Sequence, residues 1–349
     1  MSTTPIAAGA PDGPSVAPPA PRMNATGVAR RVAGWQSRFP ALQLLALIAV
    51  VAYGLATIPG FGSSPSIKSM AVLAALLGLA ALPQTLVVLL GGIDFSIPAF
   101  IAAGGILASA LAGGHGWPVG VVLVLIVVGC GACGAVSGFV CHRFTANPLI
   151  ITLGMYAVVE GIILVSTNGN VTDPPPNSLI RWTAVNGTTL GVSIPPVVVL
   201  WIVVALVTGL ALARTPSGRR LYATGTNLRA ARLALMRTEV IWIVIFMLSA
   251  AISGLVGVLV FSYASGATSN MGDTYLFQGL TAVIIGGNAI GYARGDYWRT
   301  VLGSLILTAV TTVLIGKGFD STDTQILFGF VILIVVGLYG REQRVQDRV

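Results

Sequence analysis

The sequence predicts an all-α polytopic membrane protein, and three observations support this fold class. Hydrophobic residues make up 55% of the 349 residues, charged residues only 9%, and the mean hydropathy is +0.89. One soluble core cannot bury so much apolar surface. Apolar runs of membrane-spanning length recur between polar breaks. The basic residues are concentrated in every second polar break. Membrane proteins show this pattern because loops rich in lysine and arginine stay on the cytoplasmic side.

Residues 1–40 are expected to form a disordered cytoplasmic tail and a juxtamembrane segment. The beginning of the chain is rich in Pro, Ala, Ser, Thr and Gly and carries almost no charge. Several arginines and Trp35 follow, a combination typical of a membrane interface. The first apolar run has no small-residue cleavage site behind a short apolar core. We therefore expect an uncleaved first span.

Ten apolar stretches are expected to build one transmembrane domain at residues 41–340, followed by a cytoplasmic tail at 341–349. Their ranges are 41–60, 67–90, 97–112, 117–141, 147–166, 195–213, 240–262, 274–287, 298–315 and 324–340. The third and eighth are short, which is typical of tilted, broken or re-entrant helices. With both termini in the cytoplasm, sixteen of the nineteen lysine and arginine residues lie on the cytoplasmic side.

The first candidate functional residues lie in the segment 91–98, between the second and third expected spans. Gly91 and Gly92 let the backbone turn, and Ser96 is expected to cap a helix whose first turn contains Pro98. A charge at the bilayer centre costs roughly 2.5 to 3.5 kcal/mol, so Asp94 should face protein, water or a helix N-terminus. Two interpretations stay open, a helix-capping carboxylate and a gate residue on a transport pathway.

The cysteines do not predict a metal or redox site. Cys130 and Cys133 lie inside an apolar span among small residues, and Cys141 follows at its cytoplasmic end. Gly134 and Gly138 in the same span fit close helix packing. We expect no metal and no cofactor.

A second polar turn, at Asn147 and Pro148, leads into a span that contains Glu160. A carboxylate within a membrane span is a functional candidate by default, although hydroxyl groups or protonation can also satisfy it. The segment 166–194 that follows is polar with few charges, and it suits a neutral polar partner on the outer face.

The longest polar interruption, at residues 214–239, holds six arginines against one acid, Glu239. It cannot lie in lipid. Two interpretations are open: a solvated basic loop that fixes the topology, or a docking helix for a cytoplasmic partner.

Helix and turn signals divide this interruption into two parts. Pro216, Gly218 and Gly225 are expected to break the first part into turns. Asn227 is expected to cap a helix of about nine residues that reaches Met236.

A short echo links the two halves of the chain. The sequence VIIGG, which ends at Gly287, is similar to VLLGG, which ends at Gly92. Such an echo gives weak support for an internal duplication.

Several motifs, taken in order, resemble the permeases of bacterial ribose, xylose and arabinose type ATP-binding-cassette importers over residues 67–340. They are GGIDFS at 91–96, ANPLIITLG at 146–154, STNG at 166–169, GRRLYATG at 218–225 with Asn227, AARL at 230–233 and AVIIGG at 282–287. Each motif is weak alone, whereas their order and spacing are specific.

The resemblance implies a type II importer-like fold in the bacterial inner membrane. It implies a second permease copy or paralogue, cytoplasmic ATP-binding-cassette ATPases, an extracytoplasmic sugar-binding protein and contact with membrane lipid. By the same resemblance the coupling site for the ATPase is Gly218, Gly225, Asn227, Ala230, Ala231 and Arg232. The cytoplasmic gate is Gly91, Gly92, Asp94, Ser96, Asn147 and Pro148.

The expected function is a permease subunit that imports a monosaccharide or similar neutral polyol by alternating access. No G-x-x-x-x-G-K-[ST] sequence occurs, so the chain is not expected to be an enzyme and ATP must be bound by another chain. Candidate pathway residues are Gln84, Tyr156, Glu160, Asn168, Phe261, Tyr263 and Gln278. The alternative is an ion-coupled secondary transporter that uses Glu160 and Asp94. A membrane enzyme is disfavoured because no nucleophile–base set or histidine cluster is present.

Overall fold

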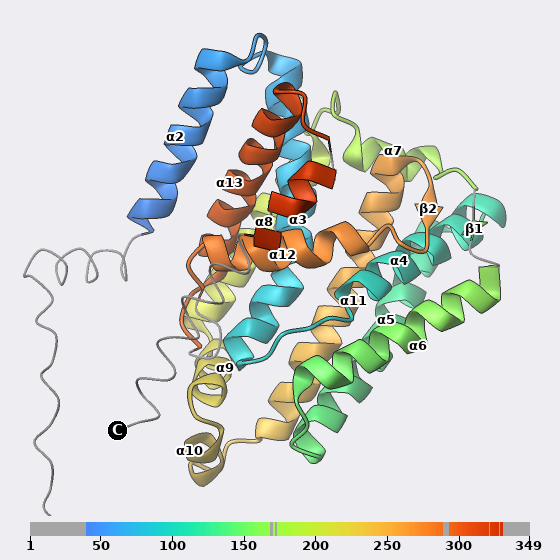
Figure 1. Ribbon diagram of the computed structural model, residues 1–349. Coiled ribbons are helices and arrows are strands. Elements are labelled where there is room, and N and C mark those ends of the chain that lie inside the picture. The colour runs from blue at the N-terminus through green and yellow to red at the C-terminus, as the bar shows by residue number, and fades with distance from the viewer. Residues whose placement is uncertain are drawn as a thin grey trace, which may run out of the picture. The chain divides into compact units, whose positions relative to one another are not determined.

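The computed structural model describes residues 40–167, 170–171, 173–288, 293–320, 322–327 and 329–330. Both expected tails, most of the tenth expected span and Asn168 lie outside these residues. The helices are α2 Ala41–Thr57, α3 Ser64–Leu90, α4 Ile97–Ala108, α5 Val119–Arg143, α6 Pro148–Thr167, α7 Asn177–Thr183, α8 Pro196–Arg214, α9 Pro216–Thr226, α10 Leu228–Leu233, α11 Thr238–Ala264, α12 Asp273–Ile285 and α13 Tyr297–Gly316 (Figure 1). A π-helical turn, Ser109–Gly114, continues α4, and strands β1 Asn170–Val171 and β2 Ala267–Thr268 pair antiparallel.

The polytopic fold class is confirmed. Among the described residues, seven helical stretches are long and apolar enough to cross a membrane, namely α3, α4 with its π-helical continuation, α5, α6, α8, α11 and α13. The expected spans at 41–60 and 274–287 correspond to α2 and α12, which have 17 and 13 residues. A total of ten spans stays a prediction.

Burial separates the central helix from the helices that face lipid. In α3, 94% of the apolar window is buried, because α8, α9, α11, α12 and α13 all pack on it. In α6 the figure is only 17%, and much of its apolar surface is exposed. Such exposed apolar surface is expected where lipid replaces water as the solvent.

The packing of α5 against α11 confirms the predicted role of the small residues in α5. A β-carbon added at Gly134 would lie 2.3 Å from the Phe246 carbonyl oxygen, and one at Gly138 would lie 2.6 Å from the Trp242 carbonyl oxygen. The two backbones can approach this closely only because both positions are glycine.

Two helices of the fold end in the same way. Gly91 after α3 has φ +95° and Gly287 after α12 has φ +94°. In each turn the left-handed glycine N–H donates to the carbonyl three residues earlier (3.0 and 2.9 Å), and the next N–H donates to the carbonyl five residues earlier (3.0 and 3.2 Å). The structure thus pairs Gly91 with Gly287, whereas the sequence echo aligned Gly92 with Gly287. The expected correspondence was wrong by one residue.

Candidate coupling surface and translocation pathway

The first part of the polar segment 214–239 is helix α9, so the expectation of turns was wrong. Thr215 precedes the helix, and its hydroxyl oxygen accepts a hydrogen bond from the Gly218 N–H (3.2 Å). Pro216 occupies the start of the helix, where a missing N–H costs nothing. Proline and glycine often signal turns, but in this segment Pro216 and Gly218 form the start of a helix.

The glycines of α9 are needed for close packing. A β-carbon at Gly218 would lie 2.2 Å from the Leu212 carbonyl oxygen, and one at Gly225 would lie 2.0 Å from the Leu89 carbonyl oxygen. The β-carbon of Ala293 lies 3.0 Å from the same added atom at Gly225. The end of α9 therefore fits between the end of α3 and the turn before α13.

Asn227 caps α10, as predicted, because its side-chain oxygen accepts a hydrogen bond from the Ala230 N–H (3.0 Å). The helix ends at Leu233, however, and does not reach Met236. Leu235 has φ +57°; its N–H donates to Arg232 (3.0 Å), and the next N–H donates to the Ala231 carbonyl five residues back (3.1 Å). This is a helix-ending motif in which glycine is the usual left-handed residue.

The exposed side chains of this segment differ from the expected ones. Ala231 is only 4% exposed and packs against the protein itself, so it offers little surface to a partner. Leu233 and Leu235 are 85% and 91% exposed. They lie at and just after the end of α10, a helix at one end of the described fold (Figure 1). Leu233 is part of the AARL motif, but neither leucine was among the expected coupling residues. Their signal was the presence of bulky apolar residues in a segment that cannot enter lipid.

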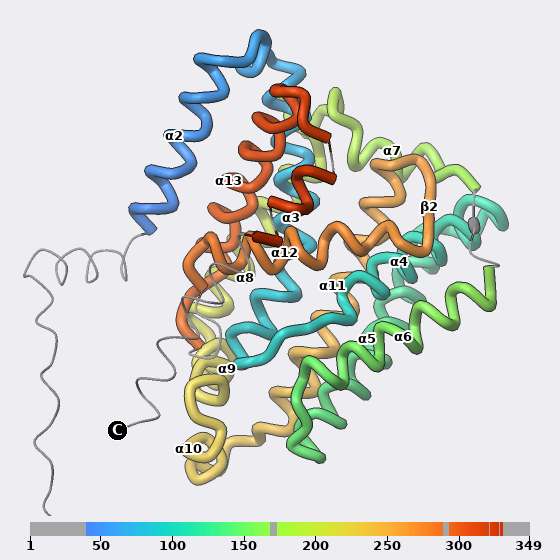
Figure 2. The backbone as a smooth tube through the Cα atoms, viewed as in Figure 1, coloured from blue at the N-terminus to red at the C-terminus, as the bar shows by residue number. Residues whose placement is uncertain are grey.

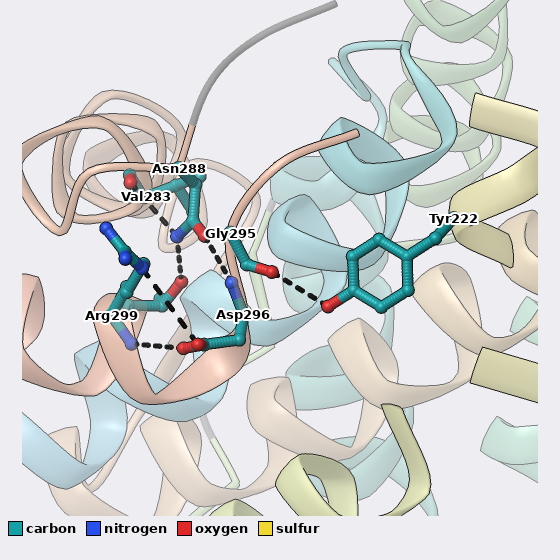
Figure 3. A network of polar contacts seen from close by, with 7 residues as sticks. Tyr222, Val283, Asn288, Gly295, Asp296 and Arg299 are labelled. Atoms are coloured by element: carbon teal, nitrogen blue, oxygen red, sulfur yellow. Dashed lines mark hydrogen bonds and ion pairs between the residues drawn. The ribbon is translucent and has the colours of Figure 1, made fainter. Parts of the chain in front are cut away.

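A hydrogen-bond network joins α9 to the turn between α12 and α13 (Figure 3). The Tyr222 hydroxyl donates to the Gly295 carbonyl oxygen (2.8 Å). The next N–H, from Asp296, donates to the Asn288 side-chain oxygen (2.8 Å), and the Asn288 amide donates to the Thr300 hydroxyl (2.9 Å). Burial, and secondarily the nearby Asp296, raises the pKa of Tyr222 to about 12, so its hydroxyl keeps the proton that it donates.

The expected gate residue Asp94 is buried and fully hydrogen-bonded. One carboxylate oxygen accepts from the Ser96 N–H (2.9 Å) and the Ser96 hydroxyl, and the other accepts from the Ser249 hydroxyl of α11 (2.6 Å). Ser96 does not cap α4 with its side chain as expected, because its hydroxyl donates to Asp94 instead. The break between α3 and α4 is a non-helical segment of the backbone (Figure 2). Asp94 fastens this break to α11 through its hydrogen bond from Ser249.

The two segments of the expected cytoplasmic gate lie against each other. A β-carbon at Gly92 would lie 3.2 Å from the Pro148 ring, and the Phe95 N–H donates to the Thr152 hydroxyl (3.0 Å). Asn147 is exposed, and its side chain accepts a hydrogen bond from the Leu149 N–H (3.0 Å). The structure thus brings both segments together at the start of α6.

Two of the expected pathway residues form a polar cluster with a residue that the sequence did not suggest. The Tyr156 hydroxyl donates to Asp273 (3.2 Å), the first residue of α12. Glu160, one turn further along α6, faces the same hydroxyl. Asp273 was missed because nothing in the sequence places the start of α12 beside α6.

The other expected pathway residues are not brought to this cluster by any described contact. Phe261 is fully buried in the hydrophobic core, and its role on a pathway stays a prediction. Gln84 is 2% exposed, and neither polar atom of its side chain has a hydrogen-bond partner. Tyr263 is 38% exposed and Gln278 is half-buried.

The comparison with protein families decides the assignment. Residues 66–336 match the family described as branched-chain amino acid transport system, permease component. The chain belongs to this permease family.

The names of individual relatives give different substrates. This chain is 28% identical to the ribose import permease of Escherichia coli K12, over 86% of its own length and 93% of that protein. It is 28% identical to the fructose import permease of Rhizobium meliloti, over 84% and 83%. It is 31% identical to an autoinducer 2 import system permease of Klebsiella pneumoniae, over 74% and 79%. No solved structure matches the permease.

Proposed function

We propose that this permease is the transmembrane subunit of an ATP-binding-cassette importer in the bacterial inner membrane, and that it forms the translocation pathway for a monosaccharide or similar neutral polyol. It works with a cytoplasmic ATPase, an extracytoplasmic binding protein and a second permease copy or paralogue, and both of its termini lie in the cytoplasm. The relatives named for ribose, fructose and autoinducer 2 import support this substrate class.

The observation that carries the proposal is the exposed tip of α10. Leu233 and Leu235 present apolar surface outside the apolar spans, and Leu235 does so from a left-handed conformation that disfavours leucine. Strained and solvent-exposed apolar residues at one point are typical of a contact site. The Tyr222 network gives the neighbouring helix α9 a direct connection to α13, and hence a route from this contact to the transmembrane helices.

The chemistry of the Tyr156 cluster supports a polyol. Asp273 and Glu160 supply carboxylate oxygens, which accept hydrogen bonds from sugar hydroxyls. The family description mentions amino acids, but a free amino acid would bring its own carboxylate toward two others. The ion-coupled alternative has less support, because Asp94 is buried and already accepts three hydrogen bonds.

The test compares substitutions at two exposed leucines, Leu235 in the proposed contact and Leu190 as the control. Leu235→Asp should lower the amount of ATPase that co-purifies with the permease by at least about tenfold, as loss of a contact hot spot does. Leu235→Gly should also lower it while leaving the helix end stable, since glycine prefers the left-handed conformation. Both amounts are measured by mass spectrometry of the purified complex, with membrane insertion checked by immunoblotting.

Leu190→Asp is the matched control. Leu190 is also a leucine at positive φ (+51°) and is 100% exposed, but it lies in the segment expected on the outer face. It should leave ATPase binding unchanged. Equal retention of the ATPase by Leu235→Asp and the unmutated permease would contradict docking at α10.

A further inference from the structure

An apolar groove of about 430 Å³ runs between α8 and α11. Both helices pack on α3, whose buried Leu82 and Leu86 line the groove. The groove opens between exposed side chains, since Val207 on α8 is 61% exposed and Val240 on α11 is 50% exposed. In a membrane such a groove must hold an apolar occupant.

The polar lining is concentrated where α9 meets α8. Thr215, Ser217 and Arg220 line the groove there, whereas most of the remaining lining side chains are apolar. Arg220 is exposed, and the ion pair present in the described part of the chain joins Arg299 to Asp296 instead. The groove therefore has a long apolar wall and one cationic end.

The acid nearest to the groove in sequence does not neutralise this end. Glu239 precedes the groove residue Val240 on α11, but it lies three residues from Trp242, on the same face of the helix. Trp242 packs beside His142 of α5, and Glu239 interacts with His142. Glu239 thus belongs to the α5 side of α11, and the charge of Arg220 remains available to an anion.

We propose that this groove binds one anionic phospholipid, with an acyl chain between α8 and α11 and its phosphate at Arg220. The shape and polarity of the groove match a molecule that has a narrow apolar chain and an anionic head. A helix from a second copy fits less well, because a helix is about 10–12 Å across and two turns of it would occupy roughly two to three times the groove volume. The proposal does not depend on the transported substrate or on the ATPase.

The first arm of the test addresses the headgroup. Purified permease is equilibrated with equal amounts of phosphatidylglycerol and phosphatidylcholine of the same chain length, and the retained lipid is quantified by mass spectrometry. The unmutated protein should retain phosphatidylglycerol over phosphatidylcholine by about fivefold. Arg220→Gln should bring the ratio close to one. Arg229→Gln, an exposed arginine of α10 outside the groove, should leave it unchanged.

The second arm addresses the acyl chain with two valines of α8. Val207→Trp fills the groove and should lower retention of both lipids severalfold. Val203→Trp is the matched control, because Val203 is 49% exposed on the same helix but does not line the groove. The proposal is overturned if Arg220→Gln keeps the preference. It is also overturned if Val207→Trp changes the oligomeric state while lipid retention stays constant, since the occupant is then a second copy.

Discussion

At the scale of single residues, Tyr156 connects two carboxylates: it is hydrogen-bonded to Asp273 and faces Glu160. Its hydroxyl donates to Asp273 on α12 and faces Glu160 on its own helix, so α6 and α12 meet at a hydrogen-bonded contact. A substrate hydroxyl that displaces this contact would exchange one hydrogen bond for another at little net cost. In the proposed function, these residues recognise a sugar by hydrogen bonding and need no change of charge.

Glu160→Gln tests that role. The amide keeps the size and the acceptor oxygen of the carboxylate and removes only its titratable charge. We expect uptake to fall by no more than about tenfold, the effect of one altered hydrogen bond. Uptake of labelled sugar is measured in cells, with a protonophore added while cytoplasmic ATP is held constant.

The same experiment separates the two classes of transporter. Accumulation should continue in the presence of the protonophore if ATP drives transport. Loss of accumulation both in Glu160→Gln and with the protonophore, at undiminished ATP, would show that protonation of Glu160 couples transport and would contradict the proposed function.

At the scale of elements, α9 is a short helix held by three others. Its start packs against the end of α8, its Gly225 lies against the end of α3, and its Tyr222 is bonded to the turn before α13. Both left-handed glycine turns, at Gly91 and Gly287, flank the segments that it contacts. A displacement of α9 therefore acts on both halves of the chain.

Tyr222→Phe should uncouple α9 from the turn before α13. The ring still packs, but the hydrogen bond to Gly295 is lost, at a cost of about 1 kcal/mol. We expect ATP hydrolysis by the reconstituted complex to continue while the number of sugar molecules moved per ATP falls. Tyr53→Phe on α2 is the control, because Tyr53 contacts Lys317 through its ring, which phenylalanine retains. An unchanged ratio in Tyr222→Phe would show that α9 does not act through Gly295.

The helix bounds show which local signals were sufficient. Expected and observed ends of the first nine spans agree within about three residues, because long apolar runs and polar breaks define them. The segment 214–239 was harder, since Pro216 and Gly225 signal turns in sequence but serve a helix start and a close contact in the fold. Likewise, no local pattern distinguishes the buried Ala231 from the exposed Leu235, because tertiary packing decides it.

For the whole molecule, the proposed ATPase contact at α10 and the pathway both depend on how the chain is oriented in the membrane. In the proposed topology, which rests on the distribution of basic residues, α9 and α10 lie in the cytoplasm and the segment around Leu190 lies outside. Cysteine is best introduced at Leu190 and Ser217, both exposed, whereas Gly187 is too tightly packed.

Membrane-impermeant thiol labelling of intact cells should modify Leu190→Cys and should modify Ser217→Cys only after permeabilisation. The three natural cysteines are replaced beforehand, although Cys130 and Cys141 are buried. Labelling of both sites from the same side would contradict the proposed topology.

The small size of α10 has a consequence for specificity among related transport systems in one cell. This six-residue helix packs mainly against α9 and α11, and its Asn227 cap and Leu235 end are local structures. Its exposed residues can thus diverge between paralogues without disturbing the membrane domain. Under the proposed docking at α10, a bacterium with many such importers can keep each permease matched to its own ATPase by changing only this tip, and a chimaera that carries the tip of another permease should exchange partners.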